Sequence, residues 1–214
     1  SCIVSLFKEG YMPKEINNTV EQTFLDSISV KQQIIDNKSY EVLEEAGDII
    51  ASSIADGGKL LLCGNGGSAA DAQHLAAEFL IRLTSEVNRE SIPALSLAQD
   101  TSTLTACIND YGPDNIFKRV FSALSSKGDT LLAITTSGNS KNIIETLKLA
   151  REIGIYSLGF LGNGGGDALE YCDAAFIVPS KITARIQESH ITAGHALLQY
   201  VEDSLLENGW LTRE

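Results

Sequence analysis

The sequence is short of features that would each point to a particular class of protein. It has 16 lysines and arginines against 28 aspartates and glutamates, which gives a formal net charge of -12. Nucleic acids and anionic membranes attract basic surfaces, so this balance argues against both as partners. No run approaches the roughly 20 consecutive apolar residues of a membrane-spanning helix. We therefore expect no binding to nucleic acid and no membrane span.

Cysteines are also few and far apart. Cys2, Cys63, Cys107 and Cys172 are scattered without a CxxC pair, a spacing that fits reduced cytosolic thiols better than a disulfide framework. Residues 1–10 have a short apolar patch but neither a basic n-region nor a long apolar h-region, so we expect no signal peptide there. Together these observations predict a cytoplasmic protein.

The composition that is present is that of an α/β domain. Hydrophobic residues make up 43% of the 214 residues, which is enough for one sizeable core. Two helices are predicted within residues 13–57, and apolar runs alternate with helical patterns over residues 59–207. Strands that alternate with helices imply right-handed crossovers and a parallel sheet. We predict one domain over residues 1–214, with a doubly wound, five-stranded parallel sheet flanked by helices.

The expected elements can be placed along the chain. The predicted strands are 59–63, 92–97, 130–134, 155–161 and 174–178. The predicted helices of this part are 68–83, 101–108 (opened by Thr101 or Ser102), 114–126, 140–153, 167–171 and 183–207. Residues 109–113, Asn-Asp-Tyr-Gly-Pro, read as a turn.

A glycine-rich turn follows the first predicted strand. Residues 64–68 read Gly-Asn-Gly-Gly-Ser and lead into a helical pattern. Glycines allow main-chain N–H groups to face one point, Ser68 is a good N-cap, and such a helix N-terminus favours an anion, usually phosphate. The glycine spacing and the missing lysine exclude a dinucleotide fingerprint and a Walker P-loop.

A second polar turn follows the third predicted strand. Thr135, Thr136, Ser137 and Ser140 offer four hydroxyls around Gly138 at a predicted helix N-terminus. For either turn alone, plain capping explains the residues equally well. Two such turns at the carboxyl edge of one parallel sheet favour an anion site. Residues 162–166 look like an echo of the first turn, but no hydroxyl or metal-type pair follows, so we interpret them as a loop.

Two of the three histidines are candidates for a metal site. His74 and Glu78 are four residues apart and share a helix face, and Gln187 and His195 lie close to one face of the last predicted helix. An isolated His/Glu pair is more often merely solvated. The four side chains together could form a mixed nitrogen and oxygen site for a divalent metal between two helices. His190 lies five residues before His195 and should face elsewhere.

Four motifs in combination resemble the sugar isomerase (SIS) domain family, over nearly the whole chain from about residue 40 to 207. They are residues 64–68, Asn109-Asp110, residues 136–140 (Thr-Ser-Gly-Asn-Ser) and residues 185–188 (Arg-Ile-Gln-Glu). Within that family the chain is similar to the phosphoheptose isomerases. The resemblance implies a flavodoxin-like fold and a homotetramer with active sites between subunits. It also implies interconversion of sedoheptulose 7-phosphate and D-glycero-D-manno-heptose 7-phosphate, the first step of ADP-heptose and lipopolysaccharide-core biosynthesis.

The resemblance also implies the residues of the site. One zinc ion per subunit would be held by His74, Glu78, Gln187 and His195. An enediol mechanism needs a base and an acid, and Glu78 and His195 are the candidates for these two roles. The implied substrate contacts are Asn65, Gly66, Gly67, Ser68, Glu78, Asn109, Asp110, Thr135, Thr136, Ser137, Ser140 and Gln187.

One position favours a different function. Ala184 stands where some heptose isomerases are expected to have Asp, and Ala there resembles a sister group, the DnaA initiator-associating proteins. The alternative is therefore a non-catalytic SIS tetramer that binds the replication initiator DnaA, although that group is expected to lack the histidine present here at 195. A sugar-phosphate sensor without turnover is a third alternative, but it would not need the metal set.

Overall fold

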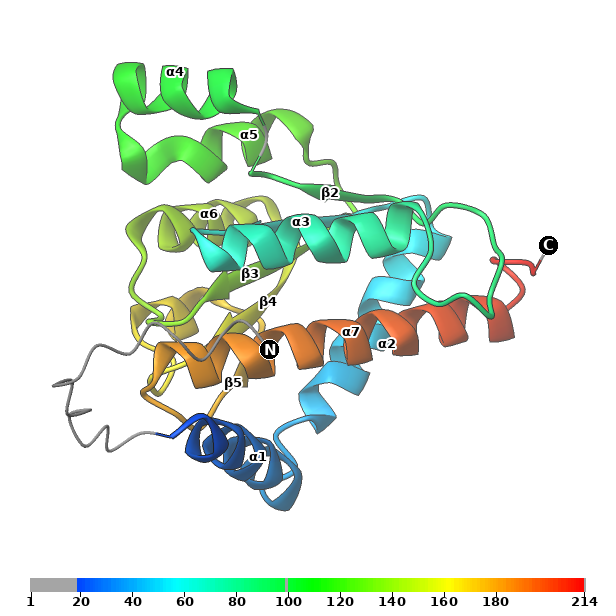
Figure 1. Ribbon diagram of the computed structural model, residues 1–214. Coiled ribbons are helices and arrows are strands. Elements are labelled where there is room, and N and C mark those ends of the chain that lie inside the picture. The colour runs from blue at the N-terminus through cyan, green and yellow to red at the C-terminus, as the bar shows by residue number, and fades with distance from the viewer. Residues whose placement is uncertain (1–18, 99, 214) are drawn as a thin grey trace, which may run out of the picture.

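The computed structural model describes residues 19–98 and 100–213, in which five parallel strands form one sheet (Figure 1). The strand order is β2-β1-β3-β4-β5, which is the flavodoxin-like order and confirms the doubly wound parallel sheet. The strands are β1 (Leu60–Gly64), β2 (Ala94–Ser96), β3 (Thr130–Thr135), β4 (Tyr156–Leu161) and β5 (Ala174–Ile177).

Helices cover both faces of the sheet and form two separate cores. One core lies under α1, α2, α3 and α7, and the other under α5 and α6. In Figure 1, α4 lies outside α5, beyond the β2 edge. The helices are α1 (Val20–Asp36), α2 (Glu41–Ala55), α3 (Gly67–Leu80), α4 (Thr101–Tyr111), α5 (Ile116–Leu124), α6 (Lys141–Ile153) and α7 (Thr183–Glu207), with short 3-10 turns η1 (Pro113–Asn115) and η2 (Asp167–Tyr171).

The central strands are apolar along their whole length because both of their faces are covered. Every residue of β1 and β3 is buried. Within β1, Leu60 and Leu62 point into one core while Leu61 and Cys63 point into the other, as the alternation of a strand requires. Burial raises the pKa of the Cys63 thiol well above its usual range, so this cysteine packs as an apolar side chain.

The N-cap residues of two helices differ from those predicted from the sequence. Ser68 is not the N-cap of α3, because Gly66 takes a left-handed φ of 56° and turns the chain earlier, which leaves Ser68 buried inside the first turn. The N-cap of α4 is Asp100 rather than Thr101 or Ser102, and its carboxylate accepts a 2.9 Å hydrogen bond from the Thr103 amide.

Several boundaries also move. The predicted turn over 109–113 begins later, because α4 continues to Tyr111 and ends at Gly112, whose φ is 80°. The helix predicted over 114–126 is split into η1 and α5. Strand β2 is shorter than the predicted 92–97, since Pro93 has no N–H to donate. The predicted last helix has the observed bounds, and the N-terminal pair matches except for residues 13–18, which lie outside the described residues.

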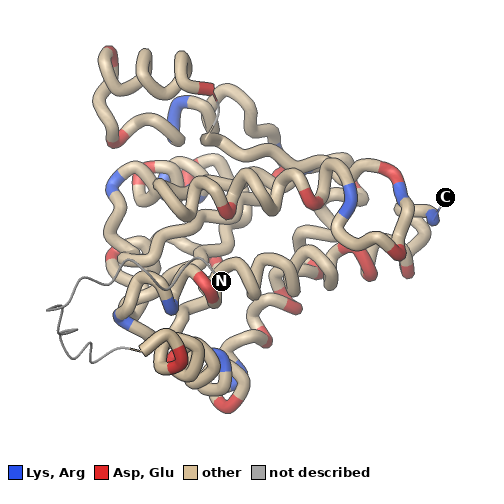
Figure 2. Tube along the Cα trace, in the orientation of Figure 1, with Lys and Arg blue, Asp and Glu red and all other residues tan. Residues whose placement is uncertain are grey.

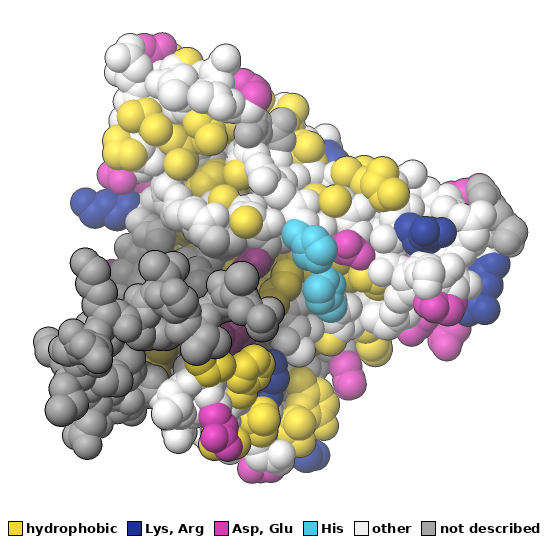
Figure 3. Space-filling model, viewed as in Figure 1, with side chains coloured by type: hydrophobic (Ala, Val, Ile, Leu, Met, Phe, Trp, Pro, Cys, Tyr) yellow, Lys and Arg dark blue, Asp and Glu magenta, His cyan; other side chains and the backbone are white. Residues whose placement is uncertain are grey.

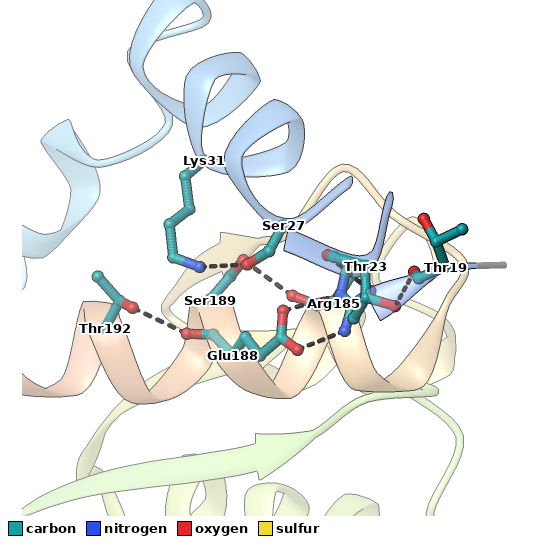
Figure 4. A network of polar contacts seen from close by, with 8 residues as sticks. All are labelled: Thr19, Thr23, Ser27, Lys31, Arg185, Glu188, Ser189 and Thr192. Carbon is teal, nitrogen blue, oxygen red and sulfur yellow. Dashed lines mark hydrogen bonds and ion pairs between the residues drawn. The ribbon is translucent and has the colours of Figure 1, made fainter. Parts of the chain in front are cut away.

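Helix α7 is the longest element and joins the N-terminal helices to the sheet. Figure 4 shows a polar network between α1 and α7. There the Arg185 guanidinium donates to both carboxylate oxygens of Glu188, at 2.8 and 2.5 Å, and to the Thr23 carbonyl of α1 at 3.2 Å. The network therefore fixes the first turns of α7 against α1.

Among residues 19–98 and 100–213, the charged groups give no sign of a basic face. Lysines and arginines are scattered among acidic residues along the traced chain (Figure 2). Within the described ranges, no helix has both the length and the apolarity needed to cross a membrane.

Candidate active site

The two polar turns lie side by side at the carboxyl edge of the sheet. Strands β1 and β3 pair in register with Gly64 opposite Ile134, so the segments that follow them leave the sheet as neighbours. The Asn65 and Asn142 amides exchange two hydrogen bonds of 2.8 Å each, which tie the first turn to the first turn of α6. The sequence reasoning missed Asn142; its only signal was a polar residue in the helical turn directly after the hydroxyl-rich segment.

The first turn is covered by α7. A Cβ atom built on Gly67 would come within 2.7 Å of Gln187 Nε2. Any side chain at residue 67 would therefore collide with Gln187 unless that amide moved. The structure thus brings Gln187 of α7 directly against the glycine turn.

The second turn gathers its hydroxyls into one cluster. Thr135 Oγ1 lies 3.4 Å from Ser137 Oγ and 3.1 Å from Ser140 Oγ. Ser140 is the N-cap residue of α6, yet its side chain makes no capping hydrogen bond. The hydroxyl of Ser140 therefore faces the cluster rather than the helix, which weakens the capping explanation. Thr136 is half-buried at the same bend of the chain.

Residues 162–166 support this second turn. Ala168 N donates to the Gly138 carbonyl at 2.8 Å, and Asp167 N donates to Asn139 Oδ1 at 3.0 Å. Gly138 has a φ of 68°, and a Cβ there would lie 2.0 Å from the Gly165 carbonyl oxygen. The segment that the sequence marked only as a loop thus holds the hydroxyl-rich turn from behind.

Two of the predicted metal ligands meet between α3 and α7. His74 Nε2 lies 2.8 Å from His195 Nε2, with the rings 5.0 Å apart and nearly perpendicular. Glu78 Oε1 lies 3.7 Å from His74 Nε2. Figure 3 shows two histidines side by side on the surface with an acidic side chain next to them. These three side chains are accessible to a ligand, because His74 is 46% exposed and Glu78 21%.

Close helix packing brings these side chains together. A Cβ atom on Gly194 would come within 2.6 Å of Leu75 Cδ1. Gly194 and Leu75 are the chain neighbours of His195 and His74. The missing side chain at residue 194 therefore lets α7 approach α3 at the point where the histidines face each other.

Asp71 is a further acidic neighbour that the sequence reasoning missed. Burial raises the pKa of its carboxyl, while nearby His74 and His195 lower it. Asp71 precedes His74 by three residues, so the two share a helix face, which was the available signal. The histidine pair thus has carboxyl groups on both sides along α3.

The donor types of this cluster fit zinc. Imidazole nitrogen and carboxylate oxygen both bind this ion, whereas the Gln187 amide lies against Gly67. Among the residues that the structure describes, no group of three or more His, Cys, Asp and Glu side chains is placed as it stands to hold a metal. The facing imidazole nitrogens, 2.8 Å apart, would need to separate by about half an ångström to bind one tetrahedral ion.

Asn109 and Asp110 lie away from the two polar turns, and His190 lies away from His195. Asn109 and Asp110 are in the last turn of α4, where Asn109 Nδ2 donates to Asp110 Oδ1 at 2.8 Å. Asp110 lines a groove between α4 and α5, so the structure does not bring these two residues to the polar turns. His190 is buried and its Nε2 contacts the Leu161 carbonyl at 3.1 Å, which confirms that it faces away from His195.

Comparisons with known proteins give one consistent family. The family model described as the SIS domain matches residues 23–162. The phosphoheptose isomerase of Clostridium acetobutylicum is 44% identical over 191 residues, which cover 89% of this chain and 96% of that protein. The phosphoheptose isomerase of Aquifex aeolicus is 47% identical over 188 residues, which cover 88% and 97%.

A solved structure agrees with these sequence relatives. The phosphoheptose isomerase of Neisseria gonorrhoeae superimposes with a TM-score of 0.79 at 39% identity, covering 86% of this chain and 97% of that one. The residues matched by the family model include both polar turns. The chain belongs to the SIS domain family and, within it, to the phosphoheptose isomerases.

Proposed function

We propose that this protein interconverts sedoheptulose 7-phosphate and D-glycero-D-manno-heptose 7-phosphate, as an aldose–ketose isomerase. Membership of the phosphoheptose isomerases supports a sugar-phosphate isomerase. The observation that carries the proposal is the pairing of His74 with His195 at 2.8 Å beside Glu78, together with a cluster of hydroxyls at the carboxyl edge of the sheet. The first group supplies acid and base, and the second can hold a phosphate.

The phosphate is assigned to the second polar turn. The Thr135 hydroxyl oxygen lies within hydrogen-bonding range of both the Ser137 and the Ser140 hydroxyl. Hydroxyl donors at the N-terminus of α6 can bind an anion. In a protein with a net charge of -12, a bound phosphate must be held by such local groups and not by the overall charge. The glycine turn, which contains Asn65 and contacts Gln187, is assigned to binding the hydroxyl groups of the sugar.

The proton transfers are assigned to α3 and α7. Isomerisation through an enediol moves one proton between neighbouring carbons and another between their oxygens. Glu78 is the base at one carbon, and His195 is the acid at the other. These groups project from two different helices, so a sugar bound over the exposed His74–His195 pair would meet one group from each helix.

We further propose that His74, Glu78, Gln187 and His195 hold one zinc ion per subunit. Bound there, zinc would act as a Lewis acid toward the carbonyl and hydroxyl oxygens of the sugar. A carboxylate that ligates a metal is a weaker base. The two roles assigned to Glu78 therefore compete, and the proposal requires its ligation to loosen during turnover.

Three further parts of the proposal rest on the family resemblance. They are a homotetramer with active sites between subunits, a place at the first step of ADP-heptose and lipopolysaccharide-core biosynthesis, and a cytoplasmic location. The alternative, a non-catalytic tetramer that binds the initiator DnaA, rests on Ala184 and on the Ser-Ala-Ala run over residues 68–70.

The deciding experiment is turnover of sedoheptulose 7-phosphate by the purified protein, after treatment with a chelator and after addition of zinc. We expect zinc to restore formation of the aldose. Glu78→Gln and His195→Ala should each lower kcat by at least about a hundredfold while the circular dichroism spectrum is kept. Glu152→Gln, at an exposed position on α6, serves as the matched control and should retain activity.

Two outcomes would contradict the proposal. Near-normal turnover in either site variant would remove that residue from its assigned role. A wild-type protein that binds zinc at stoichiometry but turns over nothing would favour the binding-module alternative, and a DnaA complex should then be sought.

A further inference from the structure

A fully buried ion pair lies behind the candidate site. Arg89 Nε donates to Glu202 Oε2 at 2.5 Å, and neither side chain has any exposed surface. Arg89 belongs to the segment between α3 and β2, and Glu202 belongs to α7. The pair therefore links the end of one active-site helix to the C-terminal part of the other.

Arg89 also binds the end of α3 directly. Its Nη2 donates to the Glu78 carbonyl at 3.0 Å, and its Nη1 donates to the Phe79 carbonyl at 2.9 Å. These carbonyls belong to the last turn of α3, where a helix leaves acceptors unsatisfied and favours a cation. Arg89 thus holds the main chain of Glu78, one of the groups assigned to the chemistry.

Glu202 extends this link to His195. The two residues are separated by about two turns of α7, or ~10 Å along the helix. Glu202 Oε1 has no hydrogen-bond partner among the described residues. A buried ion pair with an unsatisfied oxygen contributes little or nothing to stability compared with apolar residues of similar size, so stability alone does not explain it.

We propose that Arg89 and Glu202 are positioning residues that set the separation of His74 and Glu78 on α3 from His195 on α7. The geometry supplies two anchors for this. Gly194 brings the helices together beside the histidines, and the Arg89–Glu202 pair fixes their far ends. A helix pair held at both points cannot rotate or slide without breaking a buried contact. The inference rests on the proposed function only in taking these histidines and Glu78 as the active groups.

The test compares a fully buried ion pair with a partly buried one in the whole chain. Glu202→Gln removes the charge of the carboxylate with little change in shape. Arg89→Lys keeps the positive charge but loses the paired hydrogen bonds that the guanidinium donates to the Glu78 and Phe79 carbonyls. Asp129→Asn is the matched control, because Asp129 is 2% exposed and pairs with Lys59 at 2.6 Å next to the amino end of β3. That control destabilises the amino edge of the sheet, on the far side from the polar turns. The hydrogen bonds of Asp129 involve neither α3 nor α7.

Three readouts separate positioning from simple stability. The first is the ring ¹⁵N chemical shifts of His74 and His195 in metal-free protein, and the second is affinity for Co²⁺ from the absorption of the bound ion. The third is kcat and KM for sedoheptulose 7-phosphate. At a temperature well below unfolding, we expect Glu202→Gln to move both histidine signals and to weaken Co²⁺ binding at least about tenfold. It should lower kcat by more than it changes KM, whereas Asp129→Asn should change none of these.

Unmoved histidine signals in Glu202→Gln, with only a lower melting temperature as in Asp129→Asn, would overturn the inference. If Glu202→Gln does not fold, Arg89→Lys carries the same comparison, and unmoved signals there count equally against it. The histidine signals require neither zinc nor turnover. A wild-type protein that fails to isomerise the substrate would contradict the proposed function, while the inference would still be decided by those signals.

Discussion

The hydroxyl of Ser137 has both a local and a functional role. It lies 3.4 Å from Thr135 Oγ1 and accepts a 3.1 Å hydrogen bond from the Asn139 amide. A hydrogen bond to a charged group contributes about 1.5–3 kcal/mol, so Ser137→Ala should raise KM for sedoheptulose 7-phosphate at least about tenfold with a small change in kcat. Steady-state kinetics measure this, with Ser85→Ala in the loop after α3 as control. An unchanged KM would remove Ser137 from the phosphate site.

His190 makes the stability of the protein depend on pH. Burial lowers the pKa of its imidazole from 6.5 to about 4, although the contact with the Leu161 carbonyl opposes this. Between these two pH values His190 is protonated in the unfolded chain but neutral in the folded protein. The free energy of unfolding therefore falls as the pH drops from about 6.5 to 4, and this residue changes it no further below pH 4. The shift corresponds to about 3 kcal/mol of unfolding free energy.

The variant His190→Gln keeps a donor for Leu161 but does not titrate in this range. Urea unfolding at pH 7, 5.5 and 4 should therefore show the wild type losing about 3 kcal/mol more than the variant across that interval. Equal losses in both proteins would mean that His190 is protonated in the folded state well above pH 4.

At the residue scale, spacing alone identified the groups that share a helix face. His74, Glu78 and His195 could be selected because four-residue and eight-residue separations put side chains on one side of a helix. Asn142, Arg89 and Glu202 could not, because their partners lie far away in the sequence: Asn65 is the partner of Asn142, and Arg89 pairs with Glu202 across the fold. Such contacts follow from how elements pack, and periodicity does not encode that.

At the element scale, the hydroxyl-rich turn depends on the loop behind it. Gly138 has a left-handed φ of 68°, and a Cβ there would lie 2.0 Å from the Gly165 carbonyl. Gly138→Ala should therefore destabilise the protein by about 3 kcal/mol or more and raise KM, since both the strain and the overlap displace the turn. Thermal unfolding and kinetics on the same preparation measure the two effects.

Gly154→Ala separates strain from overlap. Gly154 has a similar φ of 72° but no atom within 4 Å of the added Cβ. The Gly154→Ala variant should lose only about 1 kcal/mol of unfolding free energy and keep the wild-type KM. If both alanine variants lose the same stability, the loop over residues 162–166 does not hold the turn.

The elements themselves were predictable where one local cause decided them. The long apolar runs of β1 and β3 required burial on both faces, and the stripe of α7 gave its bounds of Thr183–Glu207. The predicted N-caps of α3 and α4 were wrong because a neighbouring residue takes that position. Gly66 turned the chain before Ser68, and Asp100 displaced Thr101 and Ser102. The shielding of Gly138 by a distant loop was beyond any local pattern.

At the scale of the whole molecule, α1 carries an apolar face that the described residues do not cover. Its apolar residues include Val20, Phe24, Ile28 and Val30, and of these four only Val30 is buried. Phe24 is 67% exposed and Ile28 is 62% exposed. Apolar surface left in water forgoes about 25 cal/mol per Å² of stabilisation, and a second copy of the chain would recover it. This face is therefore where the proposed tetramer should be sensitive to charge.

Ile28→Lys should convert the assembly to smaller species, because a buried lysine without a partner is strongly disfavoured at an interface. Sedimentation velocity measures the mass, and circular dichroism should show an unchanged fold. Ile153→Lys is the matched control, since Ile153 is 44% exposed on α6, away from α1. If active sites form between subunits, Ile28→Lys also loses turnover in proportion to the lost tetramer, whereas the control loses neither. A variant that keeps the mass of the wild type would remove α1 from the interface, and a monomeric wild type with full turnover would require every catalytic group to come from one chain.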